Sequence, residues 1–147
     1  MRLYLRVLAL AALAASAAAC DESLSDLAGP SPNLEPTFAS IQREIFETTD
    51  TAGRTSCVSC HNANNPVGRF VLNLTSDVSY DALYNRPSIQ RRDLRLVNPG
   101  NPSDSYLVQK LEGRQTNGLR MPLNGPPYLS AGQILIVRRW IELGATR

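Results

Sequence analysis

The sequence is poor in the side chains that most metal sites and catalytic sites use. It has one histidine, His61, and three cysteines, which excludes a cluster of several histidines and a framework of several disulfide bonds. After Met1 the only methionine is Met121, and the only lysine is Lys110. Any metal chemistry in this chain must therefore rest on very few ligands.

Positive charge is not in excess either. Two of the 15 Lys and Arg residues, Arg2 and Arg6, lie in the predicted export signal. The 13 Lys and Arg residues that remain are equal in number to the 13 Asp and Glu residues. Nucleic-acid binding depends on a clear excess of positive charge, so we expect no nucleic-acid partner. The apolar run near the N-terminus is shorter than the roughly 20 residues that a transmembrane helix needs.

Residues 1–19 are typical of a bacterial export signal, with a charged start, an apolar stretch and the small residues Ala17–Ala19 before the cleavage point. Cys20 follows directly and resembles the lipidated cysteine of a bacterial lipoprotein, although Ala17 stands where such proteins usually have Leu. Ordinary cleavage after Ala19 would instead leave Cys20 as a free thiol. We expect Cys20 to be the lipidated mature N-terminus, which anchors the protein on the periplasmic side of a membrane.

Two further parts follow the signal. Residues 20–36 are polar and rich in Ser, Pro and acidic side chains, which predicts a flexible tether because such a segment buries little apolar surface. Residues 37–147 are long enough for one small domain with one core. The chain is thus predicted to hold a single folded domain at a distance from its lipid anchor.

The two remaining cysteines lie in one short motif, Cys57-Val58-Ser59-Cys60-His61. A CxxCH run is the attachment signature of c-type haem, since two thiols separated by two residues can add to the two vinyl groups of one haem. The adjacent imidazole then lies beneath the iron. The motif predicts one covalently bound haem c on Cys57 and Cys60, with His61 as the proximal iron ligand.

Two other interpretations of the motif have less support in the sequence. A structural zinc site needs four ligands, and the part of the chain after the predicted signal has no second CxxC and no second histidine. A thioredoxin-like dithiol requires a βαβ setting, which the neighbouring residues do not predict. Haem attachment is the remaining alternative and agrees with the predicted export.

A second haem ligand is predicted in Arg120-Met121-Pro122. The iron of a fast electron carrier needs a sixth ligand, and the part of the chain after the signal has no other histidine and no other methionine. Met121 is the conventional candidate, and Pro122 stiffens the segment that presents it. A lone methionine is more often a core residue, and this alternative stays open from the residues alone.

Three amphipathic segments predict helices around the motif. The first begins after the N-cap Thr37, and the second begins after Ser103 and ends at Gly113. The third begins with a capping box at Ser130 and ends at Gly144. Their apolar positions predict a shared core with Trp140 near the first helix: Phe38, Ile41, Ile45, Phe46, Tyr106, Leu107, Leu111, Ile136, Val137, Trp140 and Ile141.

The segments between these helices are less regular. Residues 62–68 predict a loop and residues 69–74 a short extended piece. Because a ligating imidazole has a hydrogen-bond partner on its other nitrogen, we expect the Pro66 carbonyl to accept from His61. Arg91, Arg92 and Arg95 predict a solvated basic face, and the alternatives are pairing with haem propionates or docking of an acidic redox partner.

Four separated motifs occur in order along the chain: CVSCH, NPGNPSDSYLVQKLEG, RMPLNGPPYLS and IVRRWIELGA. In this order they resemble the monohaem cytochrome c domains often called planctomycete-type, from about residue 38 to residue 145. The resemblance implies an all-α, class I-like cytochrome c fold with thioethers at Cys57 and Cys60 and with His61 and Met121 on the iron. Domains of this family are often attached to larger enzymes, whereas no catalytic domain is expected in this chain.

These features together predict a periplasmic electron carrier that is not itself an enzyme. His/Met ligation keeps the iron six-coordinate and raises its potential, redox proteins of the cell envelope are the expected partners, and no small-molecule substrate is required. One alternative is a haem peroxidase or gas sensor in which Met121 is labile, although no distal histidine is present. Another is a haem subunit of a larger respiratory complex that does not shuttle electrons.

Overall fold

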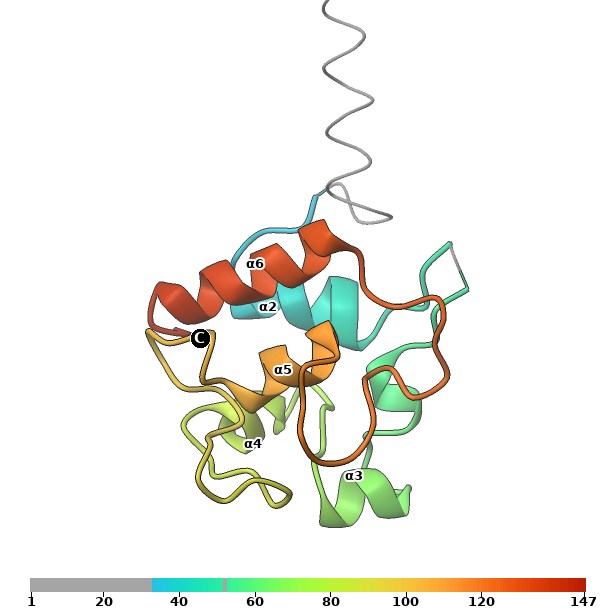
Figure 1. The fold of residues 1–147 in the computed structure, drawn as a ribbon. Helices are drawn as coiled ribbons and strands as arrows, with labels where there is room; N and C mark the ends of the chain where they lie inside the picture. The colour runs from blue at the N-terminus through green and yellow to red at the C-terminus, as the bar shows by residue number, and fades with distance from the viewer. Residues whose placement is uncertain (1–32, 52) are drawn as a thin grey trace, which may run out of the picture.

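The computed structural model describes residues 33–51 and 53–147, so the predicted export signal and Cys20 lie outside the described residues. The regular structure of the described chain is helical, as the all-α prediction requires (Figure 1). Its helices are α2 (Phe38–Ile41), η1 (Gln42–Phe46), η2 (Cys57–Ser59), α3 (Pro66–Phe70), α4 (Ser79–Leu83), α5 (Tyr106–Glu112) and α6 (Ala131–Glu142). No helix among the described residues is both long and apolar enough to cross a bilayer.

The first helix begins where the sequence predicts. Thr37 is extended, and its Oγ1 accepts a hydrogen bond from the Ser40 amide at 3.3 Å, which satisfies one of the free N–H groups at the start of α2. The π-helical turn η1 continues α2 directly and ends at Phe46. Leu34, which lies in the range predicted as tether, packs against the core of the domain.

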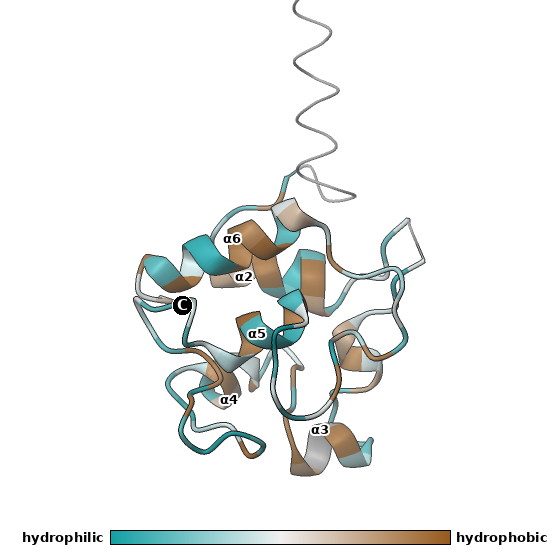
Figure 2. Cartoon of the chain, in the orientation of Figure 1, coloured by the Kyte–Doolittle hydropathy of each residue, from teal (hydrophilic) through white to brown (hydrophobic). Residues whose placement is uncertain are grey.

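The last helix, α6, is also confirmed at both ends. The Ser130 hydroxyl accepts from the Gln133 amide at 3.1 Å, and the Gln133 side chain accepts from the Ser130 amide at 3.0 Å, which is the predicted capping box. Gly144 follows the helix with a φ of +98°, a left-handed conformation that glycine adopts without strain. The apolar stripe of α6 packs into one core with apolar residues of α2 and η1, and brown segments mark both α6 and α2 in Figure 2.

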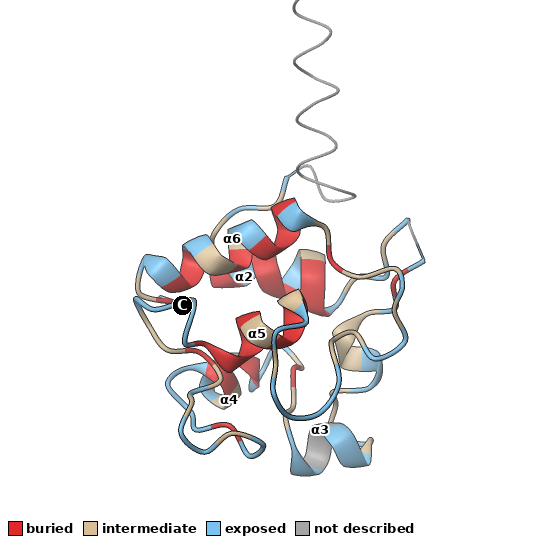
Figure 3. Cartoon of the chain, viewed as in Figure 1, coloured by how far each residue is buried: buried red, intermediate tan, exposed pale blue. Residues whose placement is uncertain are grey.

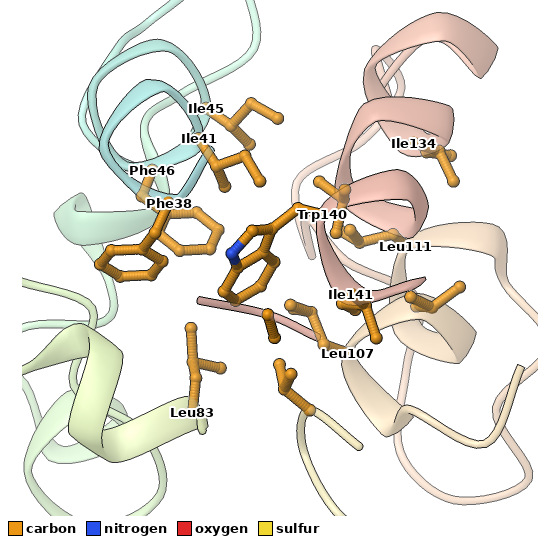
Figure 4. Packing of buried hydrophobic residues seen from close by; sticks show 14 of the residues in the cluster. Phe38, Ile41, Ile45, Phe46, Leu83, Leu107, Leu111, Ile134, Trp140 and Ile141 are labelled. Atoms are coloured by element: carbon orange, nitrogen blue, oxygen red, sulfur yellow. The ribbon is translucent and has the colours of Figure 1, made fainter. Parts of the chain in front are cut away.

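The core lies between α6, the first helix and α5, and the buried faces of these helices point toward one another (Figure 3). Trp140 is at its centre, and its indole points from α6 toward the side chains of the first helix (Figure 4). The ring centroids of Trp140 and Phe38 are 5.4 Å apart, which confirms the predicted contact. Leu83 of α4 and Leu107 and Leu111 of α5 complete the packing.

Two element predictions are wrong in position. Helix α5 begins after Ser105, not after Ser103, because the Asn101 and Asp104 side chains hydrogen-bond to each other at 2.7 Å and close a separate turn ahead of the helix. Residues 66–70 form helix α3 instead of a loop and an extended piece. Asn65 caps α3 by accepting from the amide of residue 67 at 2.9 Å, and a proline at the first position favours the helix.

Candidate functional site

The CxxCH motif forms a closed turn. Its first three residues are the 3₁₀ helix η2, and the amides of Cys60 and His61 both donate to the Cys57 carbonyl, at 3.2 and 2.9 Å. The Asn62 side chain donates back to two carbonyls of η2 at 2.7 and 3.2 Å. Two thiols and one imidazole are thus carried by one short, internally hydrogen-bonded unit.

The imidazole of His61 is held by the segment that follows α3. Its Nδ1 atom lies 2.9 Å from the carbonyl oxygen of Leu72, and the Leu74 amide donates to the His61 carbonyl at 2.9 Å. The partner is therefore not the Pro66 carbonyl, because Pro66 begins α3. Since a carbonyl oxygen only accepts, Nδ1 carries a proton, and in the neutral ring Nε2 then has the lone pair that can bind a metal.

The two thiols of the motif face different surroundings. Cys57 is half-buried against the core, and burial raises the pKa of its thiol to about 11, although the nearby Arg54 guanidinium opposes the shift. Cys60 is exposed. Both are free in the described structure, so a group attached to both sulfurs would have one edge at the core and another at the surface.

Met121 lies on the long loop between α5 and α6. It is half-buried and packs against the same core cluster as Cys57. Asn124, three residues later, hydrogen-bonds to Thr55 just before the CxxCH motif. The loop after α5 therefore reaches the green segment that carries the motif (Figure 1), and the Met121 loop is joined to the residues beside it.

A buried ion pair that we did not predict lies just before the motif. Arg54 is 1% exposed, and its Nε donates to the Asp50 carboxylate at 2.9 Å. The Arg54 amide donates to the same carboxylate at 3.0 Å, and one of its guanidinium nitrogens donates to the Ile45 carbonyl at 3.3 Å. The sequence signal that could have predicted this ion pair is the spacing of four residues between Asp50 and Arg54.

The basic cluster is engaged within the protein itself. Arg91 pairs with Asp93 at 2.5 Å, and this hydrogen bond lowers the pKa of the Asp93 carboxyl to about 2. Arg95 donates to the Asn85 carbonyl at 2.7 Å, and Arg92 is exposed. The cluster thus forms a solvated face in which two of the three guanidinium groups already have partners.

The donor set that the sequence predicts for a haem lies at the motif and on the loop joined to it. It consists of two free thiols, one imidazole with its Nε2 available, and one thioether on a loop joined to the residues before the motif. Hollows of about 420 and 380 Å³ lie elsewhere, beside Phe38 and beside Phe70, and are not lined by these four residues. In the described part of the chain, no group of three or more His, Cys, Asp or Glu side chains is placed to hold a metal ion.

Comparison of the chain with protein-family models, with curated proteins and with solved structures finds no match.

Proposed function

We propose that this protein is a c-type cytochrome that carries one haem c and transfers single electrons. The observation that best supports this proposal is the hydrogen bond from His61 Nδ1 to the Leu72 carbonyl, 2.9 Å long. It fixes the orientation of the imidazole and leaves Nε2 as the metal-binding nitrogen, in the same turn as the two thiols.

Each of the four residues has one role in this proposal. Cys57 and Cys60 would form thioethers to the haem, His61 would bind the iron through Nε2, and Met121 would bind it through Sδ. When bound, the haem supplies a one-electron Fe(III)/Fe(II) couple whose potential is raised by thioether ligation. The fold around the haem is then a class I-like cytochrome c fold, with the chain holding both iron ligands in place in either redox state.

The chain also leaves a route for electrons. Cys60 is exposed while Cys57 packs against the core, so a haem attached to both sulfurs would lie near the surface at Cys60. A protein partner could approach the haem there without any opening of the domain. We therefore propose redox proteins of the cell envelope as partners, with the domain exported and anchored by a lipid on Cys20.

The test is an absorption spectrum of the full chain after maturation in a bacterial host with a cytochrome c assembly system. We expect covalent haem that survives denaturation, a six-coordinate low-spin spectrum in both redox states, and no reaction with CO. Met121→Ala should bind CO readily. Rapid electron exchange with a soluble redox protein should distinguish a shuttle from a haem subunit that does not exchange electrons.

Other outcomes would overturn parts of the proposal. If the parent binds CO as readily as Met121→Ala does, Met121 is not the ligand, and a peroxidase or gas sensor becomes the better proposal. If the matured protein carries no covalent haem, the cytochrome assignment fails entirely. Cys57→Ala and Cys60→Ala are the matched controls, because each removes one thioether and leaves His61 unchanged.

A further inference from the structure

The only lysine of the chain holds its ammonium group inside the protein. Lys110 lies in α5 and is 8% exposed. Its Nζ donates to the carbonyl oxygens of Asn117 and Leu119, at 3.0 and 3.1 Å, and lies 5.2 Å from the centroid of the Tyr106 ring. A buried ammonium is tolerated only where such acceptors replace water, so the two carbonyls and the lysine depend on one another.

The main chain of the same residue holds Met121. The Lys110 carbonyl accepts from the Met121 amide at 3.0 Å. Arg120 adds a bond from its Nε to the Leu111 carbonyl at 3.0 Å. Lys110 is thus bonded to three points of one short segment, residues 117–121, and the last of these points is the candidate iron ligand.

The segment fits closely over the ammonium. Gly118 lies between the two carbonyls that accept from Lys110 and has a φ of +70°. A Cβ added to Gly118 would lie 2.5 Å from the Lys110 Nζ. A side chain at this position would displace the ammonium or the Gln90 amide, and the left-handed backbone there also favours glycine.

We propose that Lys110 is a positioning residue for Met121. The Lys110 ammonium fixes the backbone of residues 117–119 and thereby keeps the Met121 thioether on the iron. This inference rests on the proposed function, because it requires Met121 as an iron ligand. An outside ligand can bind only after the thioether leaves the iron, and Met121 moves with the loop that carries it. Opening this loop breaks two charge-assisted hydrogen bonds and strands the ammonium, so opening is rare while Lys110 is in place.

The experiment uses the haem-loaded full chain, the Met121→Ala variant as the ligand-free reference, and four further variants. Lys110→Met keeps the length and apolar stem but removes the donors, and Lys110→Arg restores the charge and donors on a different head group. Gly118→Ala disturbs the same contact from the loop side. Ser105→Ala is the matched control, because it removes partly buried hydrogen bonds at the start of α5 without touching residues 117–121.

The measured quantity is the rate at which added imidazole displaces the thioether from the ferric protein. We expect this rate to rise about tenfold in Lys110→Met and in Gly118→Ala. It should lie nearer the parent in Lys110→Arg and stay within about twofold of the parent in Ser105→Ala. Hydrogen exchange at the Met121 amide should accelerate in Lys110→Met and Gly118→Ala, and not in Lys110→Arg or Ser105→Ala.

Two results would overturn the inference in distinguishable ways. If Lys110→Met folds, remains low-spin and binds imidazole at the rate of the parent, the role of Lys110 is refuted while the His/Met ligation stands. If the parent already binds imidazole as fast as Met121→Ala does, the ligand assignment and the inference are both refuted. Should Lys110→Met fail to mature, Gly118→Ala decides by the same comparison, because the role of Lys110 predicts a faster rate in that variant.

Discussion

The side-chain amide of Gln42 donates to the carbonyl oxygen of Leu74, 32 residues further along the chain, at 2.9 Å. The other end of the same amide accepts from the Ser79 hydroxyl at 2.7 Å. Because the Leu74 amide donates to the His61 carbonyl, this buried bridge connects η1 to the segment that orients the imidazole. The first helix therefore supports the candidate site as well as the core.

Replacing Gln42 by Met tests this bridge. Met has a similar length but leaves the Leu74 carbonyl and the Ser79 hydroxyl without their buried partner, so we expect the free energy of unfolding to fall by about 2 kcal/mol. Urea denaturation of the haem-loaded protein measures the change. Gln109→Met is the control, since Gln109 loses only an exposed bond to the Ser103 carbonyl. Equal losses in the two variants would contradict the role of Gln42.

The Asp50–Arg54 pair should be essential for stability. Asp50→Asn leaves the buried Arg54 guanidinium without its counter-charge, and we expect a loss of about 3 kcal/mol or more in the free energy of unfolding. Asp50→Asn combined with Arg54→Met should lose less than the sum of the single changes. Glu142→Gln, which breaks an exposed pair with Arg139, should cost less than about 1 kcal/mol. If the double variant loses as much free energy of unfolding as Asp50→Asn and Arg54→Met lose together as single variants, the two side chains are not coupled.

The thiol of Cys57 should react slowly in the folded chain before haem attachment. With a pKa of about 11, roughly one thiol in a thousand is ionised at pH 8, and only the thiolate reacts with iodoacetamide. Mass spectrometry should therefore find Cys57 alkylated far more slowly in buffer than in urea, with a rate that increases as pH rises toward 11. Because folding raises this pKa from 9.0, the thiol form is favoured in the fold, and this contribution to stability is lost between about pH 9 and pH 11. Equal rates in buffer and urea would contradict the burial.

The capping box of α6 gives a local prediction. Ser130→Ala removes the acceptor for the Gln133 amide, and we expect a loss of about 1 kcal/mol in the free energy of unfolding. Thermal unfolding of the haem-loaded protein measures the change, and Ser130→Asp should retain most of the stability because Asp also caps helices. A loss in Ser130→Asp as large as that in Ser130→Ala would show that the hydroxyl acts in some other way.

Predictions from sequence succeeded where the controlling interactions are local. Thr37 and Ser130 cap their helices through amides three residues away, and the apolar spacing of the first and last helices placed Phe38 and Trp140 in contact. The predictions of helix position failed where another polar side chain nearby in the sequence formed a cap or a turn of its own. Asn101 closes its own turn and delays α5, and Asn65 caps a helix in a segment whose composition favours a loop.

The sequence by itself determined the small set of candidate haem ligands, Cys57, Cys60, His61 and Met121, because attachment and ligation chemistry depend on residue type and short spacing. Only the tertiary structure decided which groups support them. The Leu72 carbonyl is 11 residues from His61, and the Leu119 carbonyl is 9 residues from Lys110. Backbone carbonyls are the same in every residue, so no pattern of side chains marks which of them will meet an imidazole or an ammonium. That choice is made by the path of the loops, which the packing of α2, α5 and α6 fixes.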